Sequence, residues 1–71
     1  MTRRFECIAG TSSKFWEVSQ QDQQVTVRYG RIGTTGQTQI KSFPSADAAH
    51  RHAQQQIDAK LRKGYVECAV V

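Results

Sequence analysis

The sequence predicts an α+β fold, in which an antiparallel sheet of four or five strands carries one amphipathic helix across one face. Apolar and polar residues alternate in short segments over residues 3–43, and turn-forming clusters separate these segments. After Pro44 the apolar residues recur at steps of three and four, the period of a helix. With 71 residues there is room for one hydrophobic core, so we expect a single domain over residues 1–71 rather than a multi-domain enzyme.

The N-terminal part is expected to form a meander of four strands. Glycine-rich or polar clusters punctuate it at residues 10–13, 20–24 and 33–36. Trp16 lies in a segment of strong strand formers that crosses the middle of the sheet, so we expect it in the core. The segment 65–68 is expected either to return as a short fifth strand or simply to cover the core. The four expected strands are residues 3–9, 14–20, 25–29 and 37–43.

One helix is expected between Ser45 and Gly64. Ser45 is a suitable N-cap, and Gly64 can adopt the left-handed conformation that ends a helix. Since one helix cannot cover both faces of a sheet, the uncovered face, or the hairpin rim beside it, is the surface that a partner would reach most easily. The apolar face of the helix is predicted to comprise Ala46, Ala49, Ala53, Ile57 and Leu61.

Charge and composition narrow the class of partner. Ten Lys and Arg against six Asp and Glu give a formal charge of +4, which favours acidic partners such as nucleic acid. No apolar run approaches the roughly 18 residues of a membrane span, and the N-terminus does not resemble a signal peptide. We therefore expect no membrane contact and a cytoplasmic protein, associated with the nucleoid in a bacterium. Cys7 and Cys68 allow one disulfide or two thiols, and a cytoplasmic location favours thiols.

The most informative segment surrounds Tyr29. A four-residue turn at 33–36 would place Tyr29 opposite Ile40 and Arg28 opposite Lys41. Like charges facing each other destabilise a sheet, so that pair would fit a polyanion that neutralises both, but two long side chains splayed into water are the simpler explanation. Strict alternation assigns Tyr29 to the core side, whereas a bulge at Gly30 would turn Tyr29 or its neighbour outward.

The segment Tyr29-Gly30-Arg31-Ile32-Gly33, followed by Gly36-Gln37, Lys41, Phe43 and Lys63-Gly64-Tyr65, resembles the WGR domain over about residues 15–65. That family is named for a Trp-Gly-Arg signature. It is best known from DNA-damage-responsive poly(ADP-ribose) polymerases and also occurs in bacterial proteins. The resemblance implies a curved antiparallel sheet with one helix. It also implies contact with DNA near a strand end, where the signature aromatic packs on the terminal sugar and basic neighbours hold phosphates.

Carried over to this sequence, the resemblance makes Tyr29 the stacking aromatic, Arg31 the adjacent cation and Gly30 the residue that permits close backbone approach. Arg28 and Lys41 are added from the expected strand pairing as supporting phosphate contacts. Tyr29 stands where the family usually has Trp, which keeps a flat face but loses area and the indole donor. ADP-ribosyl transfer is not carried over, because these residues hold no catalytic domain.

Other chemistry is not supported. His50 and His52 are two residues apart on the expected helix and point in different directions, and no Cys-x-x-Cys pair exists. We therefore expect no catalytic residue, no metal, no cofactor and no small-molecule substrate. The sequence predicts a non-enzymatic DNA-binding module that recognises DNA ends or breaks through an exposed aromatic and basic surface of the sheet. The alternative is a protein-protein interaction module that docks a partner through the same surface, since Tyr and Arg are also common interface residues.

Overall fold

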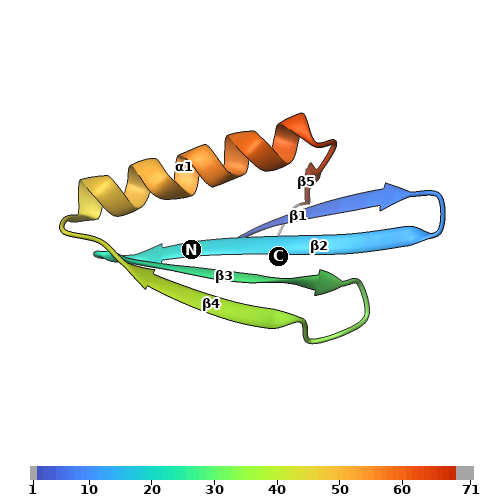
Figure 1. Cartoon of the computed structure of the whole chain (residues 1–71), viewed down its shortest axis with the longest axis horizontal. Coiled ribbons are helices and arrows are strands. Elements are labelled where there is room, and N and C mark those ends of the chain that lie inside the picture. Colours follow the sequence, from blue (N-terminus) through green and yellow to red (C-terminus); the bar gives the residue numbers. More distant parts are fainter. Residues whose placement is uncertain (1, 69–71) are drawn as a thin grey trace.

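The computed structural model describes residues 2–68 and shows a five-stranded antiparallel sheet with one helix on one face (Figure 1). The strand order is β4-β3-β2-β1-β5, so the first four strands form a meander and the last returns beside β1. The α+β prediction is confirmed, and the segment after the helix is a fifth strand. The elements are β1 (Thr2–Ala9), β2 (Ser12–Gln21), β3 (Gln24–Arg31), β4 (Gln37–Ser42), α1 (Ala46–Arg62) and β5 (Val66–Cys68).

The hydrophobic core lies between α1 and the face of the sheet that α1 covers, which we call the helix-side face. Trp16, on the central strand β2, is 3% exposed and packs against Phe5 with 5.6 Å between ring centroids. The expected core position of Trp16 is confirmed. The other buried members of the cluster are Val18, Val25, Ala49, Ala53 and Ile57.

Both predicted ends of α1 are confirmed. The Ser45 hydroxyl accepts a hydrogen bond from the Ala48 amide at 3.1 Å, and Gly64 follows the helix at φ 99°. The predicted apolar face is partly wrong, because Ala46 is exposed and Leu61 is 47% exposed. Lys60 takes the place over the core that Leu61 was expected to fill, with its Nζ 5.7 Å from the centroid of the Trp16 ring. The chain after the helix folds back, and the Tyr65 amide donates to the Lys60 carbonyl. Among the residues described, no helix combines the length and apolar character needed to cross a membrane.

The expected pairing of β3 with β4 is wrong by three residues. Tyr29 faces Gln37 and Arg28 faces Thr38, so Arg28 and Lys41 are not opposite each other. An odd shift moves every β4 side chain to the other face. Lys41 therefore lies on the helix-side face, whereas Ile40 lies on the uncovered face, which we call the open face.

The register differs because the tight turn begins earlier than expected. The amide of Thr34 donates to the Arg31 carbonyl at 3.1 Å, and Gly33 adopts φ 96° within that turn. The chain then runs back so closely that a methyl group on Gly30 would lie 2.8 Å from the Cα of Gly36. The connection between the two strands is thus five residues long rather than four.

The open face has no helix over it, yet it buries one aromatic ring. Phe15 is 2% exposed there because the guanidinium groups of Arg4 and Arg28 lie 4.6 Å and 5.1 Å from its ring centroid. Cys68 faces Arg4 on this side, whereas Cys7 shares the helix-side face with Phe5. The two thiols are consequently free and half-buried on different faces of the sheet.

Candidate nucleic-acid interface

Tyr29 keeps the strand alternation through Gly30 and lies on the helix-side face with Val25 and Val27. Its ring is half-buried and packs against the edge of the core. The Tyr29 hydroxyl donates to Gln37 Oε1 at 3.2 Å and accepts from Gln39 Nε2 at 3.4 Å. The ring is therefore held in place by contacts within the sheet, while part of its surface stays accessible.

Two surface hollows meet at Tyr29. The first, the α1–β4 groove, has a volume of about 210 Å³ and lies between the helix and β4. The second, the end hollow, has a volume of about 380 Å³ and lies around the start of β2 and the end of β3. Trp16, Tyr29 and Lys60 line both of them. A ligand that follows the helix-side face would pass Tyr29 and Lys60 between the two hollows.

The end hollow gathers positive charge. Lys14 of β2 faces Arg31 of β3 directly, which is the unfavourable like-charge arrangement that was expected for a different pair. Burial lowers the pKa of Lys60, and the neighbouring charges of Lys63 and Lys14 lower that pKa further. No carboxylate lines either hollow within residues 2–68. The protein thus holds these cations close together without neutralising them.

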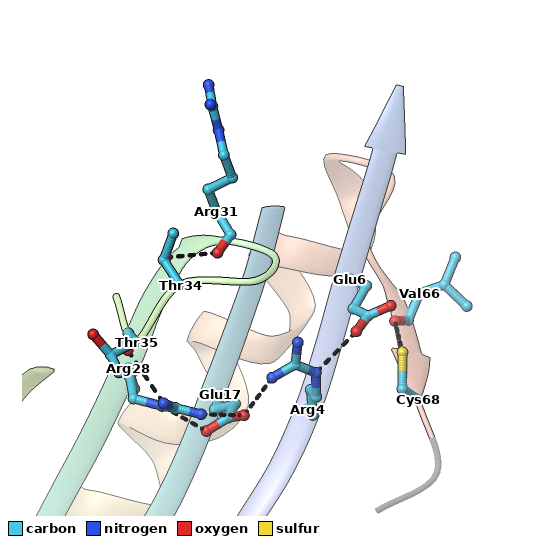
Figure 2. Close-up of polar contacts among 9 residues, drawn as sticks. All are labelled: Arg4, Glu6, Glu17, Arg28, Arg31, Thr34, Thr35, Val66 and Cys68. Carbon is cyan, nitrogen blue, oxygen red and sulfur yellow. Dashed lines mark hydrogen bonds and ion pairs between the residues drawn. The ribbon is translucent and has the colours of Figure 1, made fainter. Parts of the chain in front are cut away.

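Arg31 is the most prominent of these cations. It is exposed at the end of β3, and Figure 2 shows its side chain extending away from the strands. Its carbonyl is fixed by Thr34, which donates both its amide and its hydroxyl, at 3.1 Å and 2.7 Å. The backbone beneath Arg31 is therefore anchored, while its guanidinium group makes no hydrogen bond or ion pair with another described residue.

The basic residues fall into two groups, those that form an ion pair and those that do not. Arg3, Arg4 and Arg28 form the ion pairs of residues 2–68, and their partners are three glutamates. The other seven basic residues have no carboxylate within 4.0 Å in the part of the chain that the structure describes; they are Lys14, Arg31, Lys41, Arg51, Lys60, Arg62 and Lys63.

Arg28 lies apart from the other predicted site residues. It points to the open face, where its Nε and Nη2 donate to Glu17 at 3.1 Å and 3.0 Å and its Nη1 donates to the Thr35 carbonyl (Figure 2). Its hydrogen bonds are the main reason that the pKa of Glu17 is lowered, and Arg4 contributes to the same shift. Lys41, by contrast, lines the α1–β4 groove with Tyr29.

Gly30 has a structural explanation within the protein. A methyl group at this position would collide with the Cα of Gly36, because the chain after the turn crosses directly over it. A methyl group on Gly36 would in turn meet the Tyr29 carbonyl oxygen and, at 2.8 Å, the Phe15 ring. The close approach that Gly30 permits is therefore one between the end of β3 and the connection that leads to β4.

The WGR domain family model matches residues 1–69. The chain belongs to the WGR domain family. WGR domains are known as nucleic-acid-binding modules, and the matched residues include the Tyr29-Gly30-Arg31 segment.

This WGR domain is similar to two proteins of Escherichia coli K12. It is 47% identical over 58 residues to the protein YehF, covering 82% of this chain and 21% of YehF, and 34% identical over 67 residues to the uncharacterised protein YfeS, covering 94% and 28%. A crystal structure from Bacteroides fragilis aligns with a TM-score of 0.94 and 43% identity over 97% of this chain and 20% of that one. The chain therefore spans between a fifth and three tenths of the length of these relatives.

Two cations of this WGR domain were not predicted as site residues. Lys14 faces Arg31 because Asp22 and Gln23 alone form the turn between β2 and β3, and Asp22 adopts φ 54° there. The polar run of residues 20–24 does not indicate which two of its five residues form the turn. Lys60 lies three residues after Ile57, a helical step that places it beside the apolar stripe, but the apolar periodicity itself continues to Leu61.

Proposed function

We propose that this WGR domain is a non-enzymatic module that binds DNA ends or breaks on its helix-side face. The terminal nucleotide would pack on the ring of Tyr29, and Arg31, Lys14 and Lys60 would hold the phosphates next to it. The supporting observation is the concentration of cations around a half-exposed aromatic ring; among residues 2–68 these cations have no ion pair and no carboxylate lines the hollow. In a bacterial cell such ends arise at DNA breaks, so the proposed setting is the cytoplasm close to the nucleoid.

The shape of this surface favours an end over continuous duplex. A flat ring binds the exposed face of a sugar or base, and that face is accessible where a strand stops but is covered within a stacked helix. The cations supply the affinity that every DNA shares, because phosphate contacts carry no sequence information. Lys41 lies beyond Tyr29 in the α1–β4 groove, while Arg28 is omitted from the proposed contacts because Glu17 neutralises it on the other face.

The test compares blunt-ended, nicked and covalently closed circular DNA at several salt concentrations. Two to four neutralised phosphates would make log affinity fall with log salt at a slope of about −2 to −4. We expect tighter binding to blunt or nicked DNA than to closed circles at each salt concentration. Equal affinity for the three forms would contradict end recognition. Weak and salt-insensitive DNA binding together with a stable protein complex would instead support the protein-interaction alternative.

Two variants of Tyr29 separate its ring from its hydroxyl. Tyr29→Ala is expected to weaken end binding by about 1–3 kcal/mol, the usual size of a stacking contact. Tyr29→Phe keeps the ring but loses the hydrogen bonds to Gln37 and Gln39, so we expect end binding close to that of the parent protein. Because the ring also packs on the core, thermal unfolding of both variants is measured alongside. A large loss of stability with unchanged affinity per folded molecule would make Tyr29 a core residue only.

A further inference from the structure

The α1–β4 groove has two polar walls of regular spacing. His52, Gln56 and Lys60 follow one another at steps of four along one flank of α1. Gln39 and Lys41 project from β4 on the same face of the sheet, two residues apart. The walls therefore run side by side and present amides and cations toward the space between them.

The floor and the ends of the groove suit a flat, partly apolar ligand. Val25 and Val27 form the floor, and Tyr29 closes one end with its ring. Base faces bind apolar and aromatic side chains in this manner. A volume of about 210 Å³ is smaller than the range of roughly 300–1,000 Å³ that drug-sized ligands occupy. The groove thus has space for a single planar ring rather than for a large molecule.

The amides on the walls are available to such a ring. Gln56 makes no side-chain hydrogen bond within residues 2–68, and Gln39 uses only its Nε2, which donates to Tyr29. An amide offers both a donor and an acceptor, as the edge of a nucleobase does. Lys41, opposite Val25, and Lys60, over Trp16, place an unpaired cation toward each end of the groove. These cations stand where the phosphates on either side of a bound nucleotide would lie.

We propose that the α1–β4 groove receives an unpaired nucleotide, so that the preferred ligand is a DNA end with a single-stranded extension rather than a blunt end. The inference rests on the proposed function, since Tyr29 and Lys60 line both the groove and the end hollow. The duplex part of the DNA would end in the end hollow, and one of its strands would continue past Tyr29 into the groove as an unpaired extension. The amides read its base edge and the two lysines hold its backbone.

The experiment measures the affinity of the protein for DNA hairpins that have one open end. The open end is blunt or carries an extension of one to three thymidines on the 3′ or the 5′ strand. We expect at least one extension polarity to bind about fivefold tighter than the blunt end or better, the lower limit for stacking one base. A 2-aminopurine at the first unpaired position is expected to change its emission on binding. Blunt affinity equal to that of both extensions would overturn the inference while leaving end binding intact.

Matched variants locate the extension. Gln56→Leu, which removes a groove amide, is expected to abolish most of the gain from the extension and to leave blunt-end affinity unchanged. Gln55→Leu makes the same change on the exposed side of α1 and is the control. Thermal unfolding of both variants verifies that the helix is retained. Equal gains in both variants would show that the extension does not occupy the groove. If the parent protein binds none of the DNA ends, the proposed function itself is overturned.

Discussion

The two faces of the sheet use the same residue type for opposite purposes. Arg28, on the open face, is bonded to Glu17, whereas Arg31, three residues later, extends from the end of the same strand (Figure 2). Arg28 also lies over the ring of Phe15, while no carboxylate of residues 2–68 lies within 4.0 Å of Arg31. Glu6 and Glu17 lie on the open face, and Glu67 of β5 pairs with Arg3 on the helix-side face. None of these three glutamates lines the hollows around Tyr29. A net charge of +4 therefore understates the contrast, because the cations beside Phe15 are neutralised whereas those around Tyr29 have no ion pair among residues 2–68.

This contrast shows that counting basic residues does not locate an interface. The arginines of the open face act as covers for an aromatic ring, with their charge balanced by a half-buried carboxylate. The cations of the helix-side face are held close together at a cost to stability, and such a cost is commonly retained where binding requires it. The predictions below test that division, beginning with the largest effect.

The largest effect is expected at the two aromatic neighbours on β2. Phe15 and Trp16 face opposite sides of the sheet, and both are almost fully buried. Trp16→Ala and Phe15→Ala are each expected to cost about 3–5 kcal/mol of unfolding free energy, enough to unfold a domain of this size. Circular dichroism during thermal unfolding measures this cost. A cost below 1 kcal/mol for Phe15→Ala would show that the open face is only solvated surface.

Neutralising one arginine on each face tests the comparison directly. Arg31→Gln is expected to reduce the salt slope of DNA binding by about one and to leave stability within about 0.5 kcal/mol of the parent. Arg28→Gln is expected to do the reverse, with an unchanged salt slope and a loss of about 1 kcal/mol in stability, because Glu17 loses a partner and Phe15 loses part of its cover. Equal effects of the two variants on DNA binding would remove the distinction between the faces.

The pH dependence of stability should reflect the open face. Because its arginine partners lower the folded-state pKa of Glu17, the ion pair stabilises the protein above the ordinary carboxyl pKa of about 4.5. That contribution is lost as the pH falls below this value. Glu17→Gln is expected to be less stable at pH 7 by about 1 kcal/mol and to lose less stability on acidification. Urea unfolding at pH 7 and pH 3 measures both. Glu67, whose pKa Arg3 also lowers, accounts for part of the acid sensitivity that remains.

The smallest effect on stability is expected at Lys60, where the sign is informative. Its folded-state pKa is lowered, so the folded protein bears a cost for keeping it charged at neutral pH. Lys60→Met removes that charge and keeps a flexible side chain over Trp16, so stability should be unchanged or higher by up to about 0.5 kcal/mol. DNA affinity should fall and the salt slope should decrease by about one. Arg51→Met, an equal loss of charge on the exposed side of α1, is the control; equal losses of DNA affinity in both variants would refute a specific role for Lys60.

The fold was largely predictable, because alternation, the helical period and the caps Ser45 and Gly64 are local signals. The site was less so. The β3–β4 register depends on how the chain crosses itself at Gly30 and Gly36, and one misplaced turn residue exchanged the faces of Ile40 and Lys41. The burial of Phe15 also escaped prediction, since it depends on guanidinium groups from both neighbouring strands rather than on any apolar partner along the chain.

The packing of Phe15 beneath the loop links the two faces mechanically. The ring that Arg4 and Arg28 enclose also supports Gly36, and Gly36 crosses Gly30 at the base of the turn that carries Arg31. Loosening the enclosed ring would leave that turn without support, even though Arg4 and Arg28 are not among the proposed contacts. Substitutions far from the proposed contacts would then displace Arg31 before they unfold the domain. Position 29 would accept different aromatic residues more readily than positions 30 and 36 would accept any residue other than glycine.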